Sequence, residues 1–331
     1  MIKILHITGH YGTSKNIDNI FNNLNIKYTI KTFYHSYGFF ISEEEANEIW
    51  NENSLFFKQY DLIIITDTAV CARIFFQNMD KHNCKIIVYL PMPFDCPHRH
   101  LLKLLSNKED DFQYIKLYRE ASLNENVLFI SDNRYHQHHA EIQGINFLFK
   151  DIFRPIPIIE EVCDYKDNKI FLLNKRNFIE NYQNNLVDID YKIYDQNQKF
   201  KNHQELRVYK GMLHLPYQVN IMQLWENIGA NIIHFIPSKK FIKKLIWENK
   251  WYSWEEKYRD PCLFEKSLEL SEWYQADNEE YFVYFEDWKD LKFKINNLNY
   301  LEKKQLIYNK IIKSNIHTIQ KWKAVISYLF N

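Results

Sequence analysis

Short apolar runs alternate with longer amphipathic stretches along the first half of the chain. Apolar residues recur with helical spacing between runs that are rich in β-branched residues. The runs predict strands at 2–8, 26–33, 61–67, 84–90 and 126–132, and the stretches predict helices near 14–24, 43–58, 69–80, 108–122 and 134–143. Near-continuous apolar strands separated by helices are typical of a parallel sheet covered on both faces. The pattern therefore predicts a Rossmann-like, doubly wound domain.

Two prolines interrupt this alternation in "DIFRPIPIIEEV". Pro155 and Pro157 each remove a backbone donor, which indicates a domain boundary. The pattern then restarts, with strands predicted at 168–175, 190–196, 211–217, 230–237 and 280–285, and a clear helix at 218–229. We expect an α/β fold with a Rossmann-like domain at 1–153, a facing one at 154–300 and a C-terminal helix at 301–331. Ligands of such folds bind at the carboxyl ends of the strands, so we expect a cleft between the two sheets.

Charge and cysteine usage exclude several classes of protein. Lys+Arg and Asp+Glu both number 42, so the basic excess typical of nucleic-acid binding is missing. The five cysteines are scattered without a C-x-x-C pair, which indicates reduced thiols in the cytoplasm. The chain enters a strand pattern at once, and no apolar run approaches the ~20 residues of a membrane span. We expect a soluble cytoplasmic protein without an integral membrane segment, and its oligomeric state stays open.

The loop after the first strand, "TGHYGTSKN", carries two glycines and a histidine. Gly9 and Gly12 are expected to let the backbone turn and approach a ligand at the next helix's N-terminus, although an ordinary strand-to-helix turn is the alternative. The glycine spacing lacks the dinucleotide fingerprint, which disfavours a nicotinamide-dependent dehydrogenase. His10 is a candidate general base because imidazole titrates near neutrality.

Two carboxylates follow predicted strands of the first domain. Asp67 ends the third strand, and Asp95 follows the fourth together with His98. A carboxylate in this place faces the expected cleft and can activate or orient an acceptor hydroxyl. Asp67 can equally cap the next helix, and the choice of base among His10, Asp67 and Asp95 stays open. His136 and His139 lie one helical turn apart but lack an H-E-x-x-H pattern, so no metal site is expected.

The stretch "GMLHLPYQVNIMQLWENIG" predicts a strand, a turn and a helix that begins near Gln218 and ends at Gly229. The free N–H groups and the positive dipole end of this helix suit a diphosphate. Glu226, about two turns along, is placed to accept hydrogen bonds from a ribose. The alternative is a helix and strand pair with a surface glutamate.

The segment "HLPYQVNIMQLWENIGANIIHFIPS" resembles the donor-binding segment of glycosyltransferases of the GT-B fold. The resemblance implies that Glu226 binds the donor ribose and that Lys175 and Arg176, in "FLLNKRN", neutralise the leaving diphosphate. It also implies which residues form the turn beneath the diphosphate: Tyr217, Gln218, Val219 and Asn220. Asn220 stands where a smaller Ser or Thr is commoner. Gln218 replaces the first acid of the double-glutamate pattern of retaining families, which leaves the stereochemical outcome open.

The resemblance implies a glycosyltransferase that moves a hexose or pentose from a nucleoside-diphosphate-sugar to a hydroxyl of a glycan or glycoprotein. Fixed cations and a helix end can disperse the leaving group's charge, so neither a metal nor another cofactor is expected. A nucleotide-sugar epimerase of the same fold and a catalytically inert nucleotide- or sugar-binding module are the alternatives. The sugar, the nucleotide and the acceptor are left open.

Overall fold

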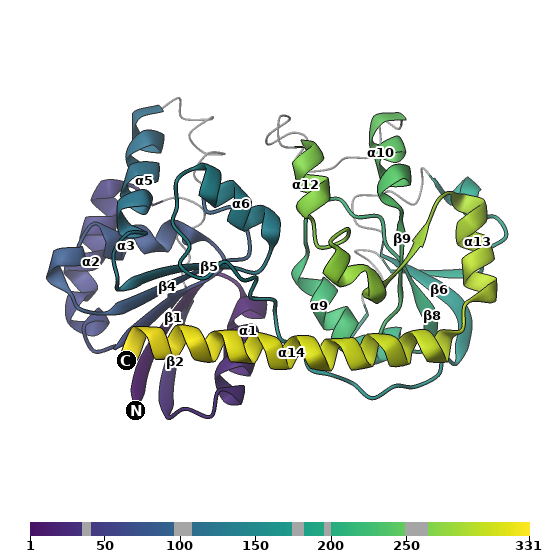
Figure 1. Ribbon diagram of the computed structural model, residues 1–331, viewed down its shortest axis with the longest axis horizontal. Coiled ribbons are helices and arrows are strands. Elements are labelled where there is room, and N and C mark those ends of the chain that lie inside the picture. Colours follow the sequence, from purple (N-terminus) through teal and green to yellow (C-terminus); the bar gives the residue numbers. More distant parts are fainter. Residues whose placement is uncertain (35–40, 96–107, 174–181, 195–199, 249–263) are drawn as a thin grey trace. The chain divides into compact units, whose positions relative to one another are not determined.

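The computed structural model describes residues 1–34, 41–95, 108–173, 182–194, 200–248 and 264–331. The chain divides into two compact units, Met1–Ile156 together with His317–Asn331, and Pro157–Ile316. Each unit contains a parallel five-stranded sheet flanked by helices (Figure 1). The predicted α/β class, the two Rossmann-like sheets and the C-terminal helix are thereby confirmed.

The sheet of the first unit has the strand order β2-β1-β3-β4-β5, with all neighbours parallel. Its strands are β1 (Ile2–Thr8), β2 (Tyr28–Tyr34), β3 (Leu62–Ile65), β4 (Lys85–Leu90) and β5 (Val127–Ser131). This is a flavodoxin-like order, in which the direction of winding reverses between β1 and β3. Ligands of open α/β sheets bind outside the carboxyl ends of the strands at this switch point.

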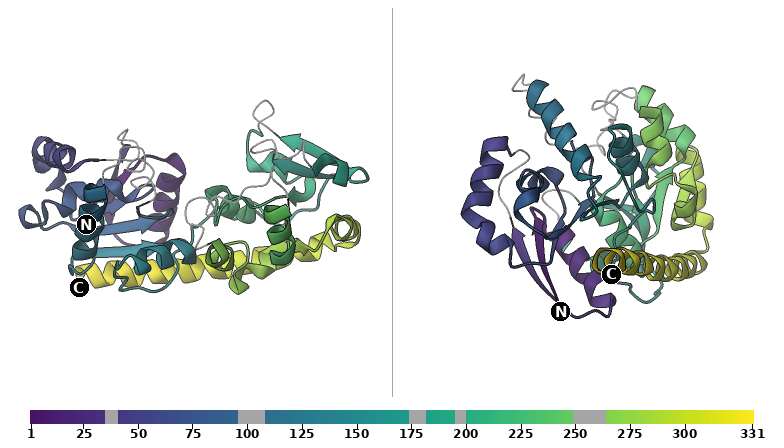
Figure 2. Two further views of the ribbon diagram at one scale, coloured as in Figure 1. Left: turned by 90° about the horizontal axis from the view of Figure 1, so that it is seen from above. Right: turned by 60° about the vertical axis from the view of Figure 1, so that its left-hand side comes forward.

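Successive strand residues of the first unit enter two different cores. Ile63 and Ile65 pack on one face of β3, and Leu62 and Ile64 pack on the other. Burial on both faces explains why the strands read as continuous apolar runs. The helices α2 (Glu43–Phe57) and α5 (Lys108–Ala121) cover one face, and α1 (Tyr11–Asn23) and the end of α14 (Tyr300–Phe330) cover the other (Figure 2). The helices of this unit are α1 (Tyr11–Asn23), α2 (Glu43–Phe57), η1 (Ala69–Ala72), α3 (Arg73–Phe76), η2 (Met79–Lys81), α5 (Lys108–Ala121) and α6 (Arg134–Ile142).

The helix predicted at 69–80 is instead divided into three short pieces, η1, α3 and η2. All residues of Ala69–Phe76 are buried, so this segment has no solvent-facing stripe. Its one charged residue, Arg73, donates from its guanidinium to the Ile41 carbonyl at 3.1 Å and to the Gln77 side chain at 3.0 Å. A segment buried on all sides is shaped by its neighbours more than by its own helical propensity.

The second unit repeats the order with β10-β9-β8-β6-β7, which places its switch point between β6 and β8. All ten predicted strands are present in the two sheets. The strands here are β6 (Asp167–Leu173), β7 (Tyr191–Tyr194), β8 (Tyr209–Leu213), β9 (His234–Pro237) and β10 (Phe282–Phe285). The helices are η4 (Gln183–Leu186), α8 (His203–Leu206), α9 (Met222–Gly229), α10 (Lys239–Glu248), α12 (Phe264–Leu270), η6 (Ala276–Tyr281) and α13 (Trp288–Asn297).

The last helix, α14 (Tyr300–Phe330), contributes residues to both units. Its first part, up to Ile316, belongs to the second unit, and its remainder packs in the core of the first through Trp322, Val325, Ile326 and Leu329. Within the described ranges, no helix has both the length and the apolar character that crossing a membrane requires.

Candidate functional site

The loop after β1 is held by hydrogen bonds that fix His10. The Thr8 and Thr13 hydroxyls are 2.6 Å apart, and Thr8 accepts a hydrogen bond from the His10 N–H at 3.1 Å. His10 is the N-cap of α1, and its Nδ1 accepts from the Gly12 N–H at 3.0 Å. Because Nδ1 is the acceptor, neutral His10 carries its proton on Nε2 and presents a hydrogen-bond donor. While the cap is in place, His10 is therefore not set to accept a proton.

Gly12 serves this cap. It lies inside α1, and neither it nor Gly9 has a positive φ. A Cβ atom on Gly12 would lie 3.0 Å from the His10 imidazole, so this glycine makes room for the histidine ring. The His10 ring therefore gives a structural reason for a glycine at this position, and the approach of a ligand to the backbone stays a prediction.

Asp67 lies in the loop after β3, across the switch point from His10. Its backbone is left-handed, with φ of 68°. Burial raises the pKa of the Asp67 carboxyl above its ordinary value, and the nearby His10 and the Gly9 N–H, which donates to this carboxylate, act in the opposite direction. A raised pKa makes a carboxylate a stronger base, closer to the pH at which proton transfer is most useful. The structure thus brings His10 and Asp67 together.

Asp95 is buried against His139 of α6. Its side chain is 1% exposed, and one carboxylate oxygen lies 2.7 Å from Nε2 of His139. A carboxylate that is buried and bound by a histidine is poorly placed to meet an acceptor hydroxyl. The Asp95 carboxylate is thus engaged by His139, and His98 lies outside the described residues.

A second buried carboxylate, Asp132, follows β5 and was missed by the sequence reasoning. Its Oδ1 lies 3.3 Å from Nδ1 of His136, and both side chains are 2% exposed. Burial raises the pKa of Asp132 well above its ordinary value. Asp132 is the last residue of the strand predicted at 126–132, so the rule that singled out Asp67 could have found it. The described residues hold no group of three or more side chains that could bind a metal ion. In α6, His136 pairs with Asp132 and His139 pairs with Asp95.

In the second unit, the predicted donor loop follows β8 and is held through its carbonyl groups. The Trp273 indole donates to the Gln218 carbonyl at 2.9 Å, and the Glu272 N–H donates to the Val219 carbonyl at 2.9 Å. Trp273 also stacks on His214, with ring centroids 4.6 Å apart. In a trans peptide the N–H points opposite to the C=O. The N–H groups of Val219 and Asn220 therefore point away from the segment that contains Glu272 and Trp273.

The helix after this loop begins later than the sequence predicts. α9 starts at Met222 with Ile221 as its N-cap, so the loop continues through Tyr217, Gln218, Val219 and Asn220. Glu226 consequently lies about 6 Å along the helix axis from Met222, roughly one turn and not two. Its side chain is 43% exposed, and Oε2 lies 3.9 Å from Nε2 of His203. Lys175 and Arg176, predicted to neutralise the leaving group, lie outside the described residues.

His203, Glu272 and Trp273 were missed by the sequence reasoning. Each acts on the donor segment from a distant part of the chain, 23 residues in the case of His203 and Glu226 and 55 in the case of Trp273 and Gln218. No local motif marks these contacts, because they depend on how the strands of the second sheet are ordered.

Comparisons with known proteins do not place the chain in a family. No family model matches it, and no curated protein matches it. Among solved structures, one match is described as "Crystal Structure of CalG4, the Calicheamicin Glycosyltransferase", with 11% sequence identity and a TM-score of 0.44. The match covers 99% of this chain and 98% of that chain.

Proposed function

We propose that the protein is a glycosyltransferase that uses a nucleoside-diphosphate-sugar donor. The observation that carries the proposal is the loop Tyr217–Ile221 at the switch point of the second sheet. Its carbonyls at Gln218 and Val219 are bound by Trp273 and Glu272, which turns the two following N–H groups away from that segment. Adjacent N–H groups in a fixed orientation are suited to phosphate oxygens.

The second unit holds the donor in this proposal. The diphosphate contacts the N–H groups of Val219 and Asn220, and Lys175 and Arg176 supply positive charge to it. Glu226, one turn into α9, accepts hydrogen bonds from the ribose hydroxyls. As the bond between the anomeric carbon and the phosphate oxygen breaks, the diphosphate leaves with the electron pair. Fixed donors at that oxygen lower the barrier without a metal.

The first unit supplies the base and the acceptor surface. Asp67 takes the proton of the acceptor hydroxyl as its oxygen bonds to the anomeric carbon. Its raised pKa and its place at the switch point support this role over Asp95, which is buried against His139. His10, with its proton on Nε2, donates to the acceptor and orients it.

The donor site is tested by nucleotide binding to wild type and to Glu226→Ala. UDP and GDP at about 100 times Kd are expected to stabilise the wild type by about 2.7 kcal/mol. Loss of hydrogen bonds to a charged carboxylate costs about 1.5–3 kcal/mol, so Glu226→Ala is expected to weaken binding at least tenfold. Thermal unfolding with and without nucleotide measures the stabilisation, and isothermal titration calorimetry measures the two affinities. Glu52→Ala, an exposed glutamate of α2, is the control and keeps wild-type affinity.

Two outcomes contradict the proposal. If neither nucleotide binds at saturating concentration, the donor site is absent. If Glu226→Ala binds as the wild type does, the ribose contact is wrong. A nucleotide sugar that is isomerised without any acceptor would indicate an epimerase, and donor binding without turnover on a broad acceptor panel would indicate an inert binding module.

A further inference from the structure

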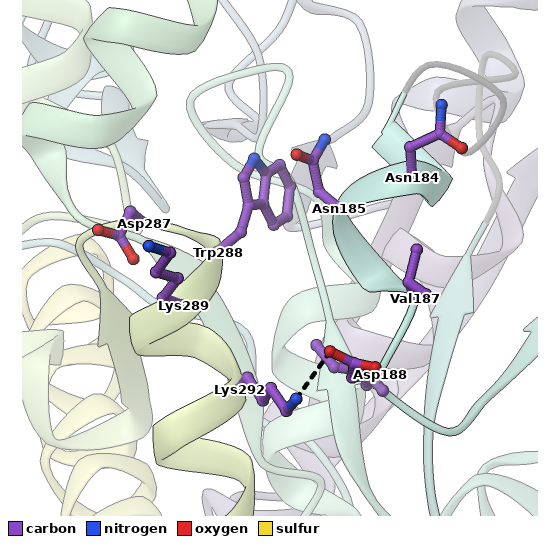
Figure 3. Close-up of a pocket in the computed structure, with 9 residues that line it drawn as sticks. Asn184, Asn185, Val187, Asp188, Asp287, Trp288, Lys289 and Lys292 are labelled. Carbon is purple, nitrogen blue, oxygen red and sulfur yellow. Dashed lines mark hydrogen bonds and ion pairs between the residues drawn. The ribbon is translucent and has the colours of Figure 1, made fainter.

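A cavity of about 450 Å³ lies in the second unit between η4 and the first turns of α13 (Figure 3). We call it the α13 pocket and define it by Asn184, Asn185, Asp188, Trp288, Lys289 and Lys292. Its volume is within the range of small-molecule sites, about 300–1,000 Å³.

Trp288 forms a rigid part of one wall. Its ring stacks on Tyr182, with centroids 5.6 Å apart and an angle of 11°, and meets Phe241 edge-on at 5.6 Å. These contacts fix the indole and leave it half-buried. Among the described residues, none accepts a hydrogen bond from the Trp288 indole N–H. A fixed indole offers both an apolar surface and an N–H donor, at little cost in conformational entropy.

Two neighbouring carboxamides form the opposite wall. Asn184 and Asn185 are exposed, and neither forms a side-chain hydrogen bond within the described part of the chain. Figure 3 shows the Asn185 side chain extending toward Trp288. Each amide provides two N–H donors and a carbonyl acceptor. This combination matches hydroxyl groups, which donate and accept at once.

The charges of the described residues that line the pocket balance. Lys292 pairs with Asp188 at 2.8 Å, and the Asp287 carboxylate caps α13 by accepting from the Asp290 N–H at 2.8 Å. With Lys289 counted, two lysines face two aspartates. A phosphate or an acidic sugar needs an excess of positive charge, which the described lining residues do not provide. A neutral polyhydroxylated ligand requires no excess of positive charge.

We propose that the α13 pocket binds a short neutral saccharide. The sugar's apolar C–H face lies against Trp288, and its hydroxyls exchange hydrogen bonds with Asn184, Asn185 and the indole N–H. This site lies outside the loop Tyr217–Ile221, and the proposal does not depend on glycosyl transfer.

The test is a titration of protein labelled with ¹⁵N at tryptophan, in which the indole N–H signal of Trp288 is assigned with Trp288→Phe. Maltotriose and chitotriose are the neutral probes, and trigalacturonate is the acidic one. At least one neutral probe is expected to shift the Trp288 signal saturably. Asn184→Ala/Asn185→Ala is expected to weaken that binding about tenfold, as the loss of one or two neutral hydrogen bonds implies. The control Asn296→Ala, at an exposed position of α13, keeps wild-type affinity.

Three results would overturn the proposal: no saturable shift with either neutral probe, equal affinity in the double variant, or tighter binding of trigalacturonate than of both neutral probes. The double variant is accepted as folded if its other indole signals coincide with those of the wild type. None of the probes carries a nucleotide, so failure here leaves the donor-site experiment unaffected.

Discussion

Asp67 combines two unfavourable features in one residue. Its φ of 68° is left-handed, and its carboxyl is held where burial raises the pKa. Among described residues other than glycine, the positive φ is shared with Asn25 and Asn231, and asparagine is one of the few residues that tolerate it. Backbone strain and a destabilised charge at the carboxyl end of a strand are more typical of a functional residue than of a structural one.

Asp67→Asn is expected to abolish activity and raise stability together. Asparagine tolerates the left-handed backbone and keeps an acceptor for the Gly9 N–H, but it cannot take a proton. Loss of a general base lowers kcat by about 10²–10⁴-fold. Because the pKa of Asp67 is raised on folding, stability falls as pH rises from the unfolded pKa through the folded one. The variant avoids this loss, so its Tm is expected to exceed that of the wild type at pH 7.

Calorimetry at pH 7 and at pH 3 checks the sign. The gain in Tm is expected to shrink at the lower pH, where the wild-type carboxyl is protonated in both states. Asp80→Asn, at an exposed aspartate of η2, is the control and changes neither activity nor Tm. A variant that is less stable than the wild type at pH 7 would show that the Asp67 carboxylate stabilises the fold.

At the scale of elements, the sequence predicted the strands better than the helix starts. The strands are buried on both faces, so each one is a continuous apolar run that the local sequence alone identifies. The start of α2 is also determined by residues close in the sequence, because Ser42 and Glu45 form a capping box. The start of α9 is not determined by its neighbours in the sequence. Ile221 provides no side-chain cap, and the residues before it are held by Trp273 and Glu272.

Some features of the candidate site could likewise be predicted from the local sequence, and others could not. Asp67 could be found because it ends a strand, and the carboxyl ends of parallel strands meet at one edge of the sheet. The enclosure of Asp95 could not be predicted, because it depends on His139, 44 residues further along the chain. The raised pKa of Asp67 could not be predicted from the sequence either, because it results from burial in the folded unit.

Gly229 shows how packing fixes the end of an element. It is the last residue of α9, and its carbonyl accepts from the Glu160 N–H at 2.9 Å. A Cβ atom there would lie 2.5 Å from the Ile158 carbonyl oxygen and 2.6 Å from the Pro157 side chain. The glycine therefore lets α9 approach the start of the second unit, which explains its place in the donor segment without a ligand.

Gly229→Ala is expected to destabilise the protein by about 1–3 kcal/mol, because the added methyl group meets backbone that cannot easily move. Urea unfolding measures the change. Gly12→Ala is the matched comparison, since its Cβ would meet only the His10 ring, at 3.0 Å. Alanine also favours a helix over glycine, so the second variant is expected to lose little stability or none. Equal losses in both variants would contradict this account of Gly229.

At the scale of the whole molecule, α14 belongs to both cores. In the second unit, Lys304 donates to the Cys163 carbonyl at 2.9 Å, and Lys303 donates to the Glu280 and Phe282 carbonyls at 2.7 and 2.8 Å. Burial lowers the pKa of Lys303 to about 8. In the first unit, Lys321 donates to the Ile152 carbonyl at 3.0 Å, and Trp322 is fully buried. One helix thus contributes contacts to both units.

Trp322→Ala tests whether the two cores unfold separately. The Trp322 ring packs against Phe21, Tyr89 and Phe153, with centroids 5.6–6.1 Å apart. Its removal leaves a cavity in the first unit and is expected to cost about 3–5 kcal/mol. Hydrogen exchange is expected to quicken in β1, β3 and β4 while β6, β8 and β9 keep their protection. Tyr328→Ala, at a residue 47% exposed on the same helix, is expected to change little. Equal loss of protection in both sheets would instead mean that α14 joins the two units into one cooperative structure.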